Sequence, residues 1–379
     1  MMSKILPKHF RKTRKLYILI MGCILISIVF YLLPIPDCLK WTQWFRENNG
    51  FDVQEKEPNM EYLNSVVKEH HEKSKFPYRY LTNEHGELVP IVLVSAFFRD
   101  DDARDTYQEY LENGIRVAGI TAYKSFPKQI DDVSEDKYHH SDGFQYTKKI
   151  KNWMCCFKNP GQYGLSSNTH NLANISESDF YNVDEEPRKE KKYDVLYVCL
   201  KDHGDKCPRD GWNAINRNFE LAEKCLPILI NEFGLRVLAV GRTGCGLEEK
   251  YGDKITTTDF LPYNEFQDKI RECKILFMPN VYDASPRVVP ECITKGVPVL
   301  MNKSILCGTK YITPETGELF TDEHDVKDAL QTLLAKKDKI HPEKWWKKHY
   351  GRQRMGEKMR DFFNTCYPGL LNNVKEVYF

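Results

Sequence analysis

The segment KILFMPNVYDASPRVVPECITKGVPVLMN, residues 274–302, decides the fold expected of this 379-residue chain. Its opening KILFM and the later VPVLM are short apolar runs that predict two buried strands. Ser285 followed by Pro286 is the pattern of a helix start, although Pro290 allows the regular helix to begin there instead. Gly296 ends this helix. A strand, a helix and a second strand within about 30 residues indicate a parallel sheet.

The same alternation of strands and helices continues through the second half of the chain. Short apolar runs predict the strands, and amphipathic stretches predict the helices between them. Further strands are expected at residues 193–200, 235–240 and 255–261, and further helices at 214–233, 263–273 and 325–335. This pattern is typical of a doubly wound α/β domain, which we place at residues 191–340.

The first half contains a second, smaller unit of the same kind. A strand at residues 90–98, a helix at 101–113 that ends at Gly114, and a strand at 116–123 make a β-α-β unit. We therefore predict a further α/β domain at residues 89–190, closed by the charged run EEPRKEKK as an exposed linker. The polar residues 34–88 are interpreted as a stem.

Residues 16–33, LYILIMGCILISIVFYLL, carry no charge and follow a tail, residues 1–15, with six Lys and Arg and no acid. A helix of this length spans about 27 Å, enough for a thin bilayer. The positive-inside bias keeps the tail cytoplasmic and sends the rest of the chain into the lumen. We predict a single-pass type II anchor of the secretory pathway, in the Golgi or ER; a cleaved signal peptide is the alternative.

Composition excludes several classes of protein. With 55 Lys and Arg against 54 Asp and Glu, the net charge of +1 gives no reason to expect a nucleic-acid partner. A mean hydropathy of −0.56 excludes a multi-span membrane protein. Of the 12 cysteines, four fall in one region and are candidates for pairing: Cys199, Cys207, Cys225 and Cys245.

Two N-x-S sequences offer N-glycosylation acceptors, Asn174 and Asn302. Asn302 directly follows an apolar strand, so we expect Asn174 alone to be modified. The basic and aromatic residues 341–379 predict a final helical segment that packs across the two domains. A helix lying on a membrane surface, with Trp345 and Trp346 as anchors, is the alternative for this segment.

In an open parallel sheet, ligands bind beyond the carboxyl ends of the strands. The strand at 235–240 is followed by a glycine-rich turn with Arg242, a candidate phosphate ligand. The strand KILFM is followed by Asp283, Ser285, Arg287 and Glu291. A helix start there is suited to a diphosphate, and Glu291 could accept hydrogen bonds from the hydroxyls of a ribose.

These features, in this order, resemble the retaining glycosyltransferases of family 4. The family's segment typically reads E-x7-E-A-x-x-x-G-x-P-V, and here an acidic residue, seven residues, Glu291 and G-V-P-V follow the same spacing. Arg242 after its strand, FLPYNEF, KILFMPN and ETGELF also match in order, so that the resemblance covers about residues 193–340. It implies the GT-B fold, with two Rossmann-like domains and an N-terminal acceptor-side domain.

The resemblance also implies a reaction and roles for residues. The enzyme would transfer a sugar from a nucleotide-sugar donor to a glycan, lipid or protein acceptor, with retention and without a metal or other cofactor. Glu291 would hold the donor ribose, and Asp283 stands where the family has a glutamate near the transferred sugar. Lys201, Arg217 and the amide of Ser285 would bind the diphosphate. A first-domain histidine would touch the sugar, with His139, His140 and His170 as candidates.

Two other interpretations remain open at the level of sequence. Asp100, Asp101 and Asp102 follow the first strand and could hold Mn²⁺ in a metal-dependent, single-domain GT-A transferase, although aspartates there also cap helices. Because Asp283 departs from the family's glutamate, the protein could instead be a catalytically degenerate lumenal glycan-binding protein.

Overall fold

The computed structural model describes residues 56–72, 76–128, 143–186, 189–202 and 207–379. Residues 56–379 form one compact unit. The predicted cytoplasmic tail, membrane anchor and first part of the stem lie outside the described residues. Within the described residues, no helix is both long and apolar enough to span a membrane.

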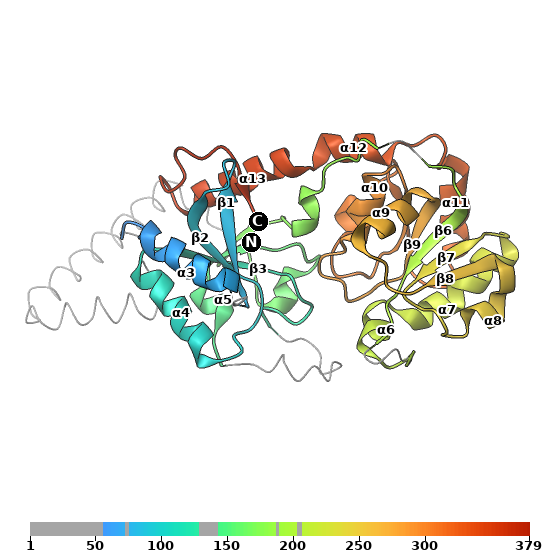
Figure 1. Cartoon of the computed structure of the whole chain (residues 1–379), viewed down its shortest axis with the longest axis horizontal. Helices are drawn as coiled ribbons and strands as arrows, with labels where there is room; N and C mark the ends of the chain where they lie inside the picture. Colours follow the sequence, from blue (N-terminus) through green and yellow to red (C-terminus); the bar gives the residue numbers. More distant parts are fainter. Residues whose placement is uncertain (1–55, 73–75, 129–142, 187–188, 203–206) are drawn as a thin grey trace, which may run out of the picture. The chain divides into compact units, whose positions relative to one another are not determined.

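The unit contains two six-stranded sheets, one in each domain (Figure 1). In the first sheet β2, β3, β4 and β5 run parallel, and β1 is antiparallel to both of its neighbours. The spatial order is β12 (Val377–Tyr378), β1 (Tyr78–Asn83), β2 (Leu88–Val94), β3 (Arg116–Ile120), β4 (Asn152–Met154) and β5 (Asn171–Ala173).

The second sheet is parallel throughout. Its spatial order is β11 (Gly317–Phe320), β10 (Val299–Asn302), β9 (Cys273–Met278), β6 (Tyr193–Val198), β7 (Val237–Val240) and β8 (Ile255–Thr258). The chain builds outward from β6 to β8 on one side and then from β9 to β11 on the other. The order therefore reverses between β6 and β9, where an open parallel sheet offers a crevice for ligands.

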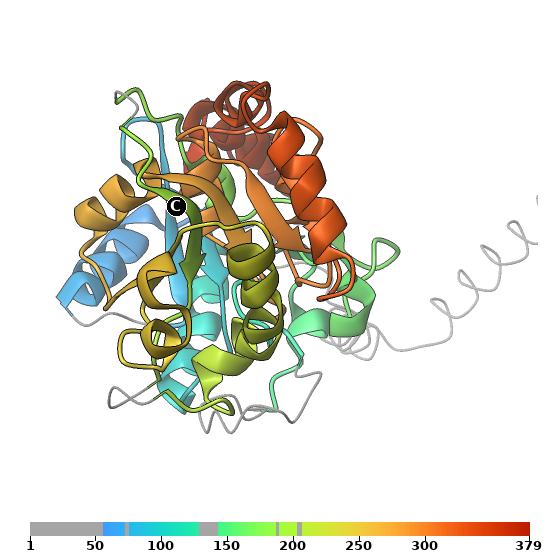
Figure 2. The ribbon, with the colours of Figure 1, turned by 90° about the vertical axis from the view of Figure 1, so that its right-hand side faces the viewer.

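Alternate residues of each strand in the second sheet face opposite cores. Val195 and Tyr197 of β6 pack in the core with the helices α7 (Phe219–Pro227) and α11 (Val326–Lys336). Leu196 packs in the core with α9 (Tyr263–Arg271) and α10 (Val288–Ile293). Figure 2 shows these helices on both sides of the sheet. The helices of this domain are α6 (Trp212–Asn216), α7 (Phe219–Pro227), the π-helical turn η3 (Ile228–Glu232), α8 (Leu247–Tyr251), η4 (Gly252–Lys254), α9 (Tyr263–Arg271), α10 (Val288–Ile293), η5 (Thr309–Tyr311) and α11 (Val326–Lys336).

The expected continuous helix at 214–233 is wrong, because it is divided between α6 and α7. Asn218 has a φ of 50°, a left-handed conformation that an α-helix cannot contain. Asparagine tolerates this conformation better than most residues. The break leaves Arg217 at the C-terminal end of α6, where its side chain can extend into the cavity described below.

The stem prediction is wrong for the residues from 60 onward. Helix α3 (Met60–Glu72) and strand β1 belong to the first domain. Leu63 and Val67 of α3 lie four residues apart and are buried in the same core as Tyr110. A single apolar stripe among Lys and Glu made this amphipathic helix look like a polar segment. The other helices of the first domain are α4 (Asp101–Glu112), α5 (Tyr146–Lys149), η1 (Pro160–Tyr163) and η2 (Glu177–Phe180).

The C-terminal segment runs from the second domain to the first (Figure 1). Trp346 of α12 (Pro342–His349) is fully buried in the core beside α9 and α10, and its Nε1 donates to the Tyr181 carbonyl at 2.7 Å. Met359 and Phe363 of α13 (Arg352–Cys366) pack on the first sheet, which β12 then completes. The aromatic side chain of Trp346 therefore fills a core, so the alternative of a membrane-surface helix is not needed to explain it.

Candidate functional site

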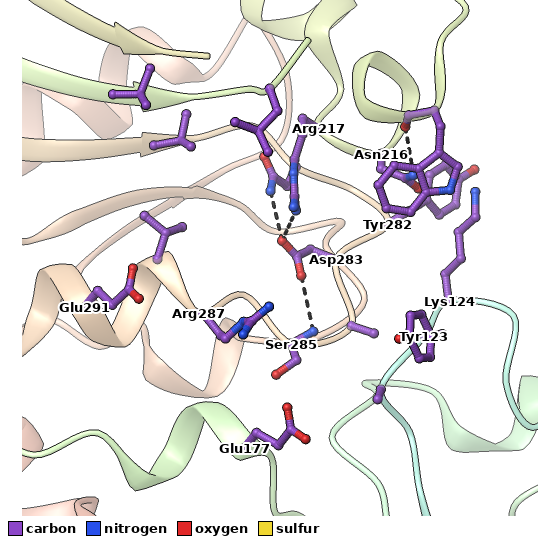
Figure 3. Close-up of a pocket in the computed structure, with 18 of the residues that line it drawn as sticks. Tyr123, Lys124, Glu177, Asn216, Arg217, Tyr282, Asp283, Ser285, Arg287 and Glu291 are labelled. Carbon is purple, nitrogen blue, oxygen red and sulfur yellow. Dashed lines mark hydrogen bonds and ion pairs between the residues drawn. The ribbon is translucent and has the colours of Figure 1, made fainter. Parts of the chain in front are cut away.

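A cavity of about 510 Å³ lies between the two domains, at the carboxyl ends of β6 to β9. This is the crevice that the reversal of strand order predicts. Five of the residues predicted from sequence lie together in its wall: Arg217, Asp283, Ser285, Arg287 and Glu291 (Figure 3).

Asp283 and Arg217 form an ion pair in this wall. The Asp283 carboxylate also accepts hydrogen bonds from Asn280 Nδ2 at 3.1 Å and from the backbone N–H of Ser285 at 3.2 Å. Its side chain is only 13% exposed, so these three donors fix the direction of the carboxylate. The break in the helix after Arg217 and the loop after β9 together bring the pair into contact.

Glu291 lies in the first turn of α10, with only 6% of its surface exposed. The hydroxyl of Tyr181 donates to its Oε1 at 3.1 Å. Burial raises the pKa of Glu291, and the hydrogen bond from Tyr181 opposes this rise. The carboxylate therefore faces the cavity as a strong acceptor for neutral donors such as hydroxyl groups.

Arg287 is exposed to the cavity between Asp283 and Glu291 (Figure 3). Unlike Arg217, it has no ion-pair or hydrogen-bond partner for its side chain anywhere in the described part of the chain. A guanidinium in this setting can offer a planar pair of N–H donors to a phosphate.

Two expectations about Ser285 are corrected by the structure. Helix α10 begins at Val288 and has six residues, so Ser285 and Pro286 lie in the preceding loop. The Ser285 amide donates to Asp283, and its hydroxyl lies 3.0 Å from the hydroxyls of both Ser176 and Ser178. Ser285 therefore holds the loop against the first domain, and its amide is already engaged.

Arg242 and Lys201 do not line the cavity. Arg242 is fully buried, with its guanidinium 4.2 Å above the Phe219 ring and its Nε 3.3 Å from Cys199 Sγ. Its two terminal nitrogens have no hydrogen-bond partner among the described residues. Lys201 forms an ion pair with Asp259 at 3.0 Å. The structure therefore does not bring these two residues together with Asp283 and Glu291 in the wall of the cavity.

The first domain contributes a wall that the sequence did not reveal. Arg79 of β1 forms an ion pair with Glu177 of η2, and both line the cavity. Lys124 follows β3, and its Nζ lies 4.8 Å from the centre of the Tyr282 ring. The position of Lys124 could have been found by inspecting the carboxyl end of its strand, as was done for the second domain. Arg79 was hidden in the predicted stem.

Three large aromatic side chains at the cavity are unusually exposed. Phe260 is 74% exposed, Tyr263 60% and Trp212 49%, and all three line the cavity. Large apolar side chains left open to water around a cavity mark binding sites, and their flat faces suit ring-shaped ligands. Phe260 and Tyr263 come from FLPYNEF, the segment that the family resemblance had singled out.

The candidate metal ligands Asp100, Asp101 and Asp102 lie at the start of a helix, away from the cavity. Asp100 Oδ1 accepts from the Ala103 amide at 2.8 Å, and Asp101 and Asp102 lie in the first turn of α4. These aspartates cap a helix. Of the histidines, His139 and His140 lie outside the described residues. His170 is buried, with its Nε2 2.7 Å from the Thr147 carbonyl, and does not line the cavity.

The two N-x-S asparagines differ in exposure. Asn174 is exposed and Asn302 is buried, so Asn174 stays the predicted acceptor. Cys207 and Cys245 form a disulfide, whereas Cys199 and Cys225 are free. Within the described residues, no group of three or more His, Cys, Asp or Glu side chains could hold a metal ion.

Comparison with known proteins defines the fold. No protein-family model matches the sequence, and no curated protein matches it. Among solved structures, a glycosyltransferase from Rickettsia africae has a TM-score of 0.51 and 10% identity, over 83% of this chain and 81% of that one. Sucrose-phosphate synthase from Thermosynechococcus elongatus has a TM-score of 0.49 and 12% identity, over 80% and 78%.

The pneumococcal O-GlcNAc transferase GtfA, solved with UDP and GlcNAc, has a TM-score of 0.49 and 9% identity, over 73% of this chain. This chain spans only 56% of that protein. At these identities the likeness concerns the fold alone. The chain has an α/β fold of two domains with mainly parallel sheets, matching the GT-B arrangement. The single-domain GT-A alternative is thereby excluded.

Proposed function

We propose that this protein is a GT-B glycosyltransferase that uses a nucleotide-sugar donor. The observation that carries the proposal is the wall formed by Glu291, Arg287 and the Asp283–Arg217 pair, at the point where the strand order of the second sheet reverses. It offers an acceptor for hydroxyl groups, an unpaired guanidinium and a fixed carboxylate within one cavity. These are the groups that a ribose, a diphosphate and a sugar would require.

The difficult step is the departure of a nucleoside diphosphate from the anomeric carbon of the sugar. Glu291 accepts hydrogen bonds from the ribose hydroxyls and so anchors the donor. Negative charge then builds on the β-phosphate as the bond breaks, and Arg287 stabilises it from a fixed position. Arg217 adds positive potential beside it, while Asp283 orients Arg217. Two guanidinium groups in the cavity support a metal-independent reaction, and the resemblance to family 4 supports retention of the anomeric configuration.

The exposed aromatic side chains support a ring-shaped ligand at the mouth of the cavity. Tyr263 and Phe260 line the same cavity as Glu291, so a base attached to the ribose would reach them. The acceptor, which we propose to be a glycan, lipid or glycoprotein, would approach from the first-domain wall with Lys124 and Glu177. We retain the proposal that residues 16–33 anchor the protein in the Golgi or ER membrane. The Cys207–Cys245 disulfide supports a lumenal location.

A degenerate binding protein is the second candidate, because Asp283 replaces a longer glutamate and is already engaged by Arg217. Turnover distinguishes the two. Residues 56–379 would be incubated with UDP-, GDP- and ADP-sugars, and release of the nucleoside diphosphate measured by chromatography. Release that is lost in Glu291→Ala supports the transferase. Binding of a nucleotide sugar without any release in the wild type would favour the degenerate protein.

A further inference from the structure

Two cysteines from different domains meet behind the wall that carries Asp283. Cys156 follows β4 in the first domain, and Cys307 follows β10 in the second. Cys156 is 6% exposed and Cys307 is fully buried. Both are present as free thiols, and the proposed transfer reaction uses neither.

The two cysteines hold neighbouring carbonyl groups of one loop. Cys156 Sγ lies 3.0 Å from the Ala284 carbonyl oxygen and donates to it. The Cys307 amide donates to the Asp283 carbonyl at 3.2 Å. The loop between β9 and α10 thus accepts hydrogen bonds from a cysteine of each domain. These two bonds bring Cys156 and Cys307 to the same loop although they are far apart in the sequence.

The side chains of Cys156 and Cys307 also interact with each other. This interaction lowers the pKa of Cys156, and the ammonium group of Lys310 acts in the same direction. Burial raises the pKa of Cys307, and the carboxylate of Asp179, which bonds to Lys310 at 2.8 Å, also disfavours thiolates here. Cys156 is therefore the better nucleophile of the pair.

We propose that Cys156 and Cys307 form a disulfide that links the two domains beside the loop of Asp283. The oxidant is a low-molecular-weight disulfide such as oxidised glutathione. The Cys156 thiolate attacks one of its sulfurs, forms a mixed disulfide and releases one glutathione thiolate. Cys307 then loses its proton to solvent and displaces the second glutathione, so that two thiols and one oxidised glutathione give one protein disulfide and two reduced glutathiones.

The burial of both thiols determines when the Cys156–Cys307 bond can form and how it affects the contact between the domains. Because both thiols are buried at the contact between the domains, glutathione can reach them only when that contact opens or before it has formed. Once made, the bond ties the end of β4 to the end of β10 and holds the contact closed. The existing Cys207–Cys245 disulfide lies within the second domain alone and has no such effect.

The neighbouring residue provides a matched control. The Cys155 thiol is similarly buried, and burial raises its pKa to about 11, but no contact between Cys155 and Cys307 is found in the described part of the chain. The variants Cys155→Ser and Cys156→Ser therefore remove adjacent thiols from the same turn, of which only the second should matter.

The test uses full-length protein purified from a secretory host. It is incubated in glutathione buffers of increasing oxidation, unfolded in N-ethylmaleimide and mapped by mass spectrometry after proteolysis. We expect a cross-linked Cys156–Cys307 peptide, with alkylation of both residues falling together, in the wild type and in Cys155→Ser but not in Cys156→Ser.

Full alkylation of Cys156 and Cys307 in the most oxidising buffer would overturn the proposal, as would a bond between either of them and Cys155. The wild-type and Cys155→Ser maps decide the question even if Cys156→Ser does not fold. Alkylation of Cys207 and Cys245 in the most reducing buffer, and their recovery as a disulfide in the most oxidising one, confirms that the buffers both reduce and oxidise protein thiols. The outcome does not depend on transferase activity, so the two proposals can fail separately.

Discussion

Replacing Arg287 with alanine should weaken binding of a nucleoside diphosphate without destabilising the protein. Arg287 is exposed to the cavity and has no side-chain partner among the described residues, so its removal leaves no buried group unsatisfied. A hydrogen bond between charged groups contributes about 1.5–3 kcal/mol. The dissociation constant should therefore rise about 10- to 150-fold, while the melting temperature in the absence of ligand stays unchanged.

The assay is isothermal titration calorimetry of residues 56–379 with the nucleoside diphosphate that binds the wild type. Arg287→Lys keeps the charge but not the planar pair of donors, so it should recover only part of the affinity. Arg354→Ala, which removes an exposed arginine of α13 outside the cavity, is the matched control and should bind as the wild type does. Equal affinities for Arg287→Ala and Arg354→Ala would refute the proposed role of the unpaired guanidinium.

Three further variants test the setting of the site. Because burial raises the pKa of Glu291, its ionised form is disfavoured in the folded protein, and the wild type loses stability as pH rises through the carboxyl range. Glu291→Gln should therefore gain stability relative to the wild type between about pH 4 and pH 7 in urea titrations, and should lose nucleotide affinity. Tyr181→Phe removes the 3.1 Å hydrogen bond to that carboxylate and should lower the free energy of unfolding by about 1.5–3 kcal/mol at neutral pH, and by less in acid. Tyr263→Phe is its control. Equal losses of stability at neutral and acid pH would contradict the assigned hydrogen bond. Arg242→Met removes a buried guanidinium that has no carboxylate partner among the described residues, and it should raise the free energy of unfolding by about 1 kcal/mol or more. Nucleotide affinity should stay unchanged, and a loss of affinity would return Arg242 to the site.

The second domain could be read from the sequence because its strands are buried on both faces. A continuous apolar run such as KILFM has few other interpretations, and β9 extends it by only one residue. The carboxyl-end rule also pointed to Asp283 and Glu291, which both follow a strand end and both line the cavity. The same rule could not predict that Arg287 lines the cavity whereas Arg242 does not, because both arginines follow a strand end. Which way a side chain turns after a strand depends on packing, here on Phe219 and Cys199.

The first domain was predicted poorly because distant segments complete it. Strand β12 and helix α13 come from the end of the chain and cover a face of the first sheet. The strands β4 and β5 have three residues each, too few to show a periodic pattern. Arg79 was missed for the same reason, since β1 gains its place only by pairing with β2 and β12.

The proposal of a nucleotide-sugar enzyme rests on the cavity binding a nucleoside diphosphate. The most direct measurement is the melting temperature of residues 56–379 with UDP, GDP, ADP and CMP, for the wild type and Glu291→Ala. At a ligand concentration of 100 times the dissociation constant, one diphosphate should stabilise the wild type by about 2.7 kcal/mol, or about 4 °C. Glu291→Ala should show no shift with the same nucleotide. A wild type that no nucleotide stabilises, or a Glu291→Ala variant stabilised as strongly as the wild type, would contradict the proposed donor site.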